Sequence, residues 1–414
     1  MEVEMAPPWK STNKTVSVST GSQSPPITFS TTYIPPHLPT SAVITPVALF
    51  ASMARCAALR RVAPAITAAL VTGSTALLEV LVDDNGPDFN VEADIDDLAD
   101  FEHTGLAGRV GNGFTDVYMS VLGYAWRDLA SALVSTGGRL ADFIYDGVPI
   151  AGYGVALVEA KGSLSASATQ PNVTARARNG YKTQVEKHLG ASSVAGQIVH
   201  GYAVSFGAVP PRLGATSHVV QTSPPSIPAV FPPSPAGSAA IPLTTPVAAR
   251  LAFGNYRAVF MLANAPVIFY HLDRLTNRPS PQIPLRDQIF ERRQSGDRWF
   301  LVGRNPEFQH TIASGWRNIF AIEEAVAESF LNQLAAYLRT SDGGAARAMF
   351  SLPTHDPALL LPPEHPSKQS YLLYPDGFAL LIDWLPSTEA RTWSKDGGLG
   401  PPHPLSSDPP VLVR

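Results

Sequence analysis

The stretch Val155-Ala156-Leu157-Val158-Glu159-Ala160-Lys161-Gly162-Ser163 decides the fold of the regular part of this chain. It is an apolar run that ends with a carboxylate and an ammonium two positions apart. Residues two apart in a β-strand point to the same face, so Glu159 and Lys161 project together. Because burial of charge costs desolvation energy, we expect this pair to be solvated, paired, or used on a metal and a charged substrate.

A second apolar segment, residues 140–145, precedes this stretch and is separated from it by the turn-rich sequence Pro149-Ile150-Ala151-Gly152. Folding the two strands about residues 150 and 151 places Asp142 opposite Glu159, with Cβ atoms about 5 Å apart. Two carboxylates that close repel each other, and one of them tends to take up a proton. Asp146 competes with Asp142 for this role, but it precedes Gly147 and fits a turn better.

A hard divalent cation removes the repulsion between the two carboxylates. Mg²⁺ takes oxygen ligands and keeps several waters, so we expect Asp142 and Glu159 to bind Mg²⁺ or Mn²⁺, with the Ala160 carbonyl as a third acceptor. Lys161 would then orient a water near the metal, lower the pKa of that water, or stabilise charge on a phosphodiester oxygen. These groups together favour in-line hydrolysis of a phosphodiester.

The surrounding pattern predicts a helix at 111–122, strands at 124–129, 140–145 and 153–160, a helix at 174–189 and a strand at 198–206. This arrangement resembles the PD-(D/E)xK nuclease superfamily, whose restriction-endonuclease-like α/β core runs helix, three strands, helix, strand. The resemblance covers roughly residues 108–208. It implies a metal-dependent nuclease that hydrolyses phosphodiester bonds, with DNA as its partner. The family's first metal carboxylate falls on Asp142, and its acid-x-lysine falls on Glu159 and Lys161.

Two departures from the family pattern concern the residues around these carboxylates. The proline that precedes the aspartate in the family is Ala141 here. Asn112 stands where many members carry a glutamate on the first helix. Asp116, one turn later on the same helical face, is expected to replace that acid as a metal ligand. If Asp116 does not do so, one metal is more consistent with the sequence than two.

The helix expected at 174–189 carries the densest basic cluster near the motif, and in the resembled fold it lies beside the active site. Arg178 and Lys182 are therefore candidate substrate contacts, and Gln184 is a candidate catalytic residue that bonds the scissile phosphate or holds Lys161. The alternative is that these side chains form a solvated helix face. His200, a lone histidine within a strand, is expected to be a core residue.

Composition restricts the remaining possibilities. The chain has 414 residues, a net charge of −4 and a single cysteine, Cys56, so disulfide scaffolds and cysteine zinc sites are excluded and a reducing, cytoplasmic location is expected. Polyanion binding must use a local basic patch. No secretory signal is expected at the start of the chain.

The sequence also predicts a division of the chain into five parts. They are a disordered segment at 1–50, a nuclease-like domain at 51–208, a Pro/Ser-rich linker at 209–246, an α+β region at 247–400 with helices and a hairpin, and a disordered tail at 401–414. Two other functions stay open. The first is a catalytically inactive binding or assembly module with the nuclease fold. The second is a membrane-associated protein that uses the apolar residues 62–82.

Overall fold

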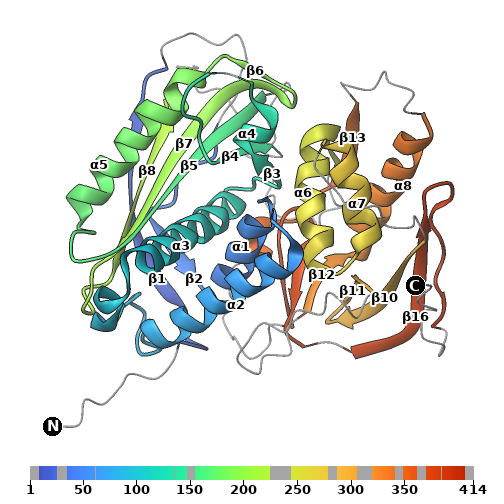
Figure 1. The fold of residues 1–414 in the computed structure, drawn as a ribbon, viewed down its shortest axis with the longest axis horizontal. Helices are drawn as coiled ribbons and strands as arrows, with labels where there is room; N and C mark the ends of the chain where they lie inside the picture. Colours follow the sequence, from blue (N-terminus) through green and yellow to red (C-terminus); the bar gives the residue numbers. More distant parts are fainter. Residues whose placement is uncertain are drawn as a thin grey trace, which may run out of the picture.

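The computed structural model describes residues 9–25, 35–60, 62–135, 137–146, 154–223, 244–277, 287–304, 319–340, 348–360, 370–383 and 385–405. Two β-sheets with their covering helices lie side by side (Figure 1). One cluster of buried apolar side chains continues from the first half into the second. The α/β class predicted from the sequence is confirmed.

The first sheet takes its strands from the N-terminal half of the chain. They are β1 (Lys14–Gln23), β2 (Ser41–Ile44), β3 (Trp126–Leu129), β4 (Phe143–Asp146), β5 (Gly154–Leu164), β6 (Ser192–Ser193), β7 (Gly196–Ala208) and β8 (Ala215–Thr222). Their order is β2-β1-β8-β7-β5-β4-β3, and β6 adds to β7. The pairs β5–β7 and β1–β8 are parallel, and the other pairs are antiparallel.

Helices cover both faces of this sheet. They are α1 (Pro46–Ala58), α2 (Pro64–Leu81), α3 (Asp100–Val121), the short α4 (Ala130–Leu133) and α5 (Gln170–Gly180). Helix α3 lies against β5 and β7 on one face, and α5 lies against β5, β7 and β8 on the other (Figure 1). A five-residue 3-10 helix (Ala93–Asp97) precedes α3. The elements α3, β3, β4, β5, α5 and β7 therefore follow in the predicted order of helix, three strands, helix and strand.

Helix α3 approaches β5 unusually closely, because both carry glycine at the crossing. A Cβ added to Gly162 would lie 1.8 Å from the Ala107 carbonyl oxygen. A Cβ added to Gly111 would lie 2.6 Å from the Gly162 backbone. The absence of two side chains thus fixes where α3 crosses the end of the strand.

The prediction that residues 1–50 are disordered is wrong for the described part of that segment. Strand β1 alternates buried and exposed side chains, with Lys14, Val16 and Val18 facing the core. Its Ser and Thr residues suit the exposed face of a strand, so composition concealed the period-two pattern. Trp9 is also buried, and its backbone N–H donates to the Glu79 carbonyl at the end of α2.

The predicted linker at 209–246 is wrong for its first part. Residues 215–222 form β8, which pairs with β7 on one side and with β1 on the other. Val219 and Val220 are fully buried, so this strand is central to the sheet. Residues 224–243, the proline-rich part of that linker, and residues 147–153, the predicted turn, lie outside the described residues.

The C-terminal half forms a second, antiparallel sheet with three helices. Its strands are β10 (Gln288–Ser295), β11 (Arg298–Gly303), β12 (Ile319–Glu323), β14 (Tyr371–Leu373), β15 (Phe378–Leu381), β16 (Leu385–Ser394), β17 (Gly398–Leu399) and β18 (His403–Pro404). Strands β9 (Thr244–Ala248) and β13 (Met349–Pro353) form a separate pair, and a 3-10 helix (Pro357–Leu360) follows β13. The helices are α6 (Ala249–Leu262), α7 (Pro266–Leu275) and α8 (Glu324–Thr340).

Two expectations for this half need correction, and one is confirmed. The near-3.6 spacing of apolar residues at 316–338 predicts one helix over that range, but residues 319–323 form β12 and the helix starts after it, where the Glu323 carboxylate accepts the Val326 N–H. The tail at 401–414 is not disordered where it is described, because β18 pairs with β16 at residues 389–390. The hairpin predicted around Pro375-Asp376-Gly377 is present as β14 and β15.

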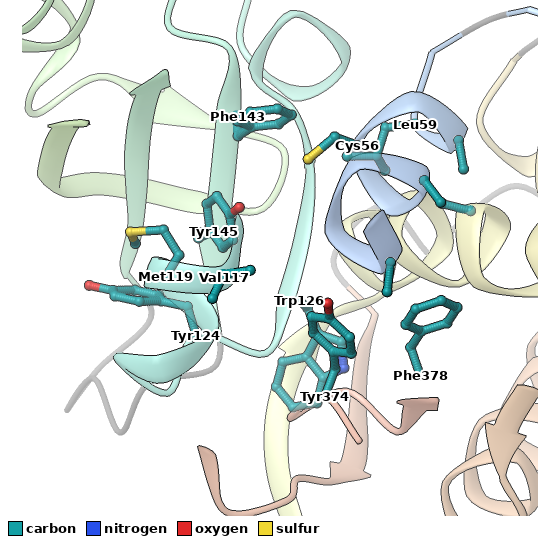
Figure 2. Close-up of a cluster of buried hydrophobic side chains, with 14 of the residues drawn as sticks. Cys56, Leu59, Val117, Met119, Tyr124, Trp126, Phe143, Tyr145, Tyr374 and Phe378 are labelled. Atoms are coloured by element: carbon teal, nitrogen blue, oxygen red, sulfur yellow. The ribbon is translucent and has the colours of Figure 1, made fainter. Parts of the chain in front are cut away.

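A buried ionic network joins the two halves of the chain. Arg55 in α1 bonds Asp116 of α3 at 3.1 Å and Asp376 of the β14–β15 turn at 2.8 Å. Arg127 in β3 binds the other oxygen of Asp116. Tyr374 stacks on the Arg55 guanidinium at 4.0 Å, and Figure 2 shows it beside Trp126 at the junction. Each charge in this network has an opposite partner, as burial requires.

Helix α2 is the one described helix that is long and apolar enough to cross a membrane, by length and composition alone. It is 39% buried within the protein. Its exposed face carries Ile66, Leu70, Leu77 and Val80.

Candidate active site

The hairpin of β4 and β5 sets the register of the candidate site. Phe143 pairs with Val158 and Ile144 pairs with Leu157, which is the register expected for a hairpin folded about residues 150 and 151. One step further along this register, Asp142 and Glu159 lie on neighbouring strands. The Ala160 N–H donates a hydrogen bond of 3.1 Å to Asp142 Oδ2, which fixes that carboxylate against β5.

Glu159 is the most unusual residue of the site. Its side chain is 1% exposed, and Oε1 accepts hydrogen bonds from Lys161 Nζ and Gln184 Nε2. The second oxygen, Oε2, is buried and has no hydrogen-bond partner within the described part of the chain. Burial and then the nearby charge of Asp142 raise the pKa of Glu159 from 4.5 to about 7, against the opposing effect of Lys161.

Lys161 and Asp142 reach solvent, unlike Glu159. Their side chains are 31% and 28% exposed. Both line a cleft of about 500 Å³ between α3, α5 and the end of β5, together with Asn112, Ser163 and Arg176. A ligand in this cleft would therefore meet Lys161 and Asp142 directly, whereas Glu159 is buried and does not line it.

Gln184 reaches Glu159 because of how the chain continues after α5. Residues Tyr181–Val185 form a π-helical turn, which is a feature frequent at functional sites. Gly180 and Gln184 both face Glu159, and a Cβ at Gly180 would lie 3.1 Å from Glu159 Cγ. Of the two roles expected for Gln184, holding Lys161 is not observed; Gln184 instead holds the carboxylate that Lys161 also binds.

Asp116 does not belong to the site, so its expected role as a metal ligand is wrong. It is fully buried, where its oxygens bind Arg55 and Arg127 and accept a hydrogen bond from Tyr145. Asn112, one turn earlier on α3, does line the cleft. Asn112 and Asp116 are one helical turn apart. Asn112 lines the cleft with an amide, whereas Asp116 belongs to the buried ionic network.

The residues present fit one hard cation held by two carboxylates. Among the residues that the structure describes, no group of three His, Cys, Asp or Glu side chains is placed to hold a metal ion. Mg²⁺ commonly uses only one or two carboxylates and completes its shell with waters and substrate phosphate. The unpartnered Oε2 of Glu159 leaves one carboxylate oxygen available to such a cation, and burial together with the charge of Asp142 raises the pKa of this carboxyl.

Some basic residues of α5 and of the turn that follows it line the cleft, and others lie on the outer surface. Arg176 lines the cleft, although the sequence did not single it out. Arg178 and Lys182 are exposed and are not among the residues that line it. Arg178 lies close enough to His218 to lower the pKa of that histidine, after the larger effect of burial.

A second residue missed from the sequence is Arg60, which follows α1. Its guanidinium lies 3.9 Å from Asp142 Oδ1. Arg60 lies about 80 positions before Asp142, and no local pattern links the two. His200 is buried in β7 as expected, and burial lowers its pKa to about 3, which keeps it neutral.

No family model, no curated protein and no solved structure matches this chain. The geometry of the site therefore carries the functional argument by itself.

Proposed function

We propose that this chain is a metal-dependent nuclease that hydrolyses phosphodiester bonds, with a restriction-endonuclease-like core formed by α3, β3, β4, β5, α5 and β7. The observation that carries the proposal is Glu159. It is a buried carboxylate with an unpartnered oxygen and a pKa of about 7, and it lies beside Asp142 and bonds Lys161, two residues that line the open cleft. Strongly perturbed acids in clefts are frequent at catalytic sites.

The roles of the three side chains follow from their positions. Asp142 and Glu159 would hold one Mg²⁺ or Mn²⁺, which supplies a Lewis acid and lowers the pKa of a bound water. Lys161 is the cation that reaches the cleft from β5, so it donates to a non-bridging phosphate oxygen or orients the attacking water. Gln184 fixes the orientation of Glu159, as outer hydrogen-bond partners of metal ligands do.

Nucleic acid, and DNA in the first place, is the proposed partner. Residues 170–185 contain Arg176, Arg178 and Lys182 but no Asp or Glu, in a chain whose net charge is −4. All three basic side chains are exposed on α5 and the turn that follows it. A basic strip next to a cleft provides the local positive field that phosphate backbones require.

Cleavage assays with purified protein test the proposal. Plasmid DNA, linear DNA and an RNA oligonucleotide are incubated with Mg²⁺, Mn²⁺ or EDTA. Cleavage should need the divalent ion and should fall at least about 100-fold in Glu159→Ala and Lys161→Ala. Lys395→Ala, an exposed lysine in the C-terminal half, is the matched control and should cleave normally. Undiminished cleavage in Glu159→Ala would show the assignment to be wrong.

A second candidate is a catalytically inactive module that keeps the same fold. It is favoured by Asn112, which places an amide in the cleft where related nucleases carry an acid. Isothermal titration with Mn²⁺ separates the two functions. Binding that disappears in Asp142→Ala supports the nuclease, whereas no binding at all supports the inactive module.

A further inference from the structure

Each of the two candidate metal carboxylates has a cationic side chain beside it. Arg60 lies 3.9 Å from Asp142 Oδ1, and Lys161 bonds Glu159 Oε1. Two negative and two positive side chains leave these two ion pairs without net charge when all four are ionised. A divalent cation therefore competes with Arg60 for the Asp142 carboxylate.

Arg60 is placed by the end of α1, outside the part of the chain that resembles a nuclease. Leu59, which caps α1, is buried, and Figure 2 shows Cys56 and Leu59 beside Phe143 at the start of β4. The Cys56 thiol donates to the Asn112 carbonyl of α3, so the end of α1 is packed against the walls of the site. The Arg60 side chain itself is 50% exposed, so it is free to turn away from Asp142.

Phosphate is the expected ligand of a guanidinium that moves away from Asp142, which lines this cleft. Arginine binds phosphate through parallel N–H donors, a geometry that a lysine ammonium cannot reproduce. We propose that Arg60 is a phosphate-binding residue of this site, which the resting protein holds on Asp142, so that divalent metal and phosphodiester bind cooperatively. The inference rests on the proposed function and deepens it.

The cooperativity follows from the exchange of partners. Metal on Asp142 frees Arg60 for phosphate, and phosphate on Arg60 frees Asp142 for metal. By linkage, each ligand must raise the affinity of the other by the same factor. Bound metal gives the site a positive net charge, which further favours a phosphodiester.

Calorimetric titration of the full chain with Mn²⁺ measures this exchange without turnover. Titrations are made alone and with a saturating phosphorothioate oligonucleotide that resists hydrolysis. In the native protein the oligonucleotide should tighten Mn²⁺ binding about 5-fold or more. Arg60→Ala should bind Mn²⁺ alone about 3-fold more tightly, because a competing unit charge is lost at a partly exposed site. The oligonucleotide should then tighten Mn²⁺ binding by less than about 2-fold.

Two further variants complete the test. Arg60→Lys keeps the charge without the planar donors, so it should bind Mn²⁺ as the native protein does but show a weaker effect of the oligonucleotide. Arg212→Ala is the matched control, because Arg212 is 47% exposed and pairs with a single carboxylate, Glu92, away from the cleft. Arg212→Ala should leave the Mn²⁺ affinity unchanged, and it should also leave the effect of the oligonucleotide on that affinity unchanged.

The outcomes separate the inference from the function on which it rests. If Mn²⁺ binds through Asp142 but Arg60→Ala changes neither the Mn²⁺ affinity nor its response to oligonucleotide, the role of Arg60 is overturned and the nuclease proposal stands. If the native protein binds no Mn²⁺, the nuclease proposal fails and the role of Arg60 fails with it.

Discussion

The side-chain amide of Gln184 donates to Glu159 Oε1, the same oxygen that accepts the Lys161 ammonium. Both donors therefore lie on one side of the carboxylate, and Oε2 is left buried and unpartnered among the described residues. Since the donors come from the turn after α5 and from β5 itself, the orientation of Glu159 is fixed before any ligand arrives. This arrangement leaves one oxygen of Glu159 for the proposed cation.

Replacing Gln184 tests this arrangement. Gln184→Leu removes a hydrogen bond that lowers the pKa of Glu159, so the carboxylate should hold its proton more tightly. We expect the affinity for Mn²⁺ to fall about 10–100-fold, as is typical when an outer partner of a metal ligand is lost. Calorimetric titration at pH 7 measures this. Gln197→Leu, at an exposed glutamine bonded to the Gly190 carbonyl, should bind normally.

The raised pKa of Glu159 predicts a pH dependence of stability with a defined sign. The folded state binds this proton more tightly than the unfolded state, so stability falls as pH rises from 4.5 to about 7. Glu159→Gln removes the charge. The glutamine variant should therefore gain about 2–3 kcal/mol of stability relative to the native protein between pH 4 and pH 8. Denaturant titrations at the two pH values check this.

Glu323→Gln provides the opposite case for the same measurement. Burial alone would raise the pKa of Glu323, but the His355 imidazole 3.6 Å away and a hydrogen bond from the Val326 N–H lower it below the ordinary value. Its ionised form thus favours folding, and the glutamine variant should be less stable than the native protein at pH 8. Equal behaviour of the two variants would contradict the assignment for Glu159.

The close crossing of α3 over β5 predicts a contrast between two glycines of one helix. Gly111→Ala places a Cβ 2.6 Å from the Gly162 backbone and should destabilise the fold by about 1–3 kcal/mol. Gly108→Ala, three residues earlier, meets no atom within 4 Å and should stabilise the helix by about 0.5–1 kcal/mol. Urea unfolding measures both. A similar effect of the two substitutions would contradict the close packing.

A substitution in the buried ionic network around Asp116 should lower the stability of the fold without changing the candidate metal site. Asp116→Asn removes one charge between Arg55 and Arg127, which should cost about 3–5 kcal/mol of unfolding free energy. Because Asp116 lies outside the cleft, the folded variant should bind Mn²⁺ as the native protein does. Weaker Mn²⁺ binding in a folded Asp116→Asn protein would restore this residue as a metal ligand.

The part of the site on the hairpin could be predicted because it depends on local sequence. The register of β4 and β5 follows from two apolar segments on either side of a short turn, and register alone sets Asp142 against Glu159. Asp116 could not be placed in this way. Its spacing from Asn112 predicts a shared helix face, but its true partners Arg55 and Arg127 come from other elements.

Strands β1 and β8 of the first sheet were missed for a related reason. Strand β1 is rich in Ser and Thr, and its parallel partner β8 lies about 200 residues away, next to a proline-rich segment. Parallel pairs leave no turn signal in the sequence. Arg60 was missed likewise, because an arginine after a helix gains meaning only from the carboxylate beside which the fold places it.

The pairing of β1 with β8 has a consequence for the order in which the protein is made. Residues 14–23 leave the ribosome early, but their parallel partner at 215–222 follows only after about 200 more residues. Strand β2 can pair with one edge of β1 early, but at ordinary rates of translation, about 5–20 residues per second, the other edge waits about 10–40 s for β8. The earliest described strand is thus joined to the rest of the sheet late, and until then the edge of β1 that β8 covers needs protection from other chains.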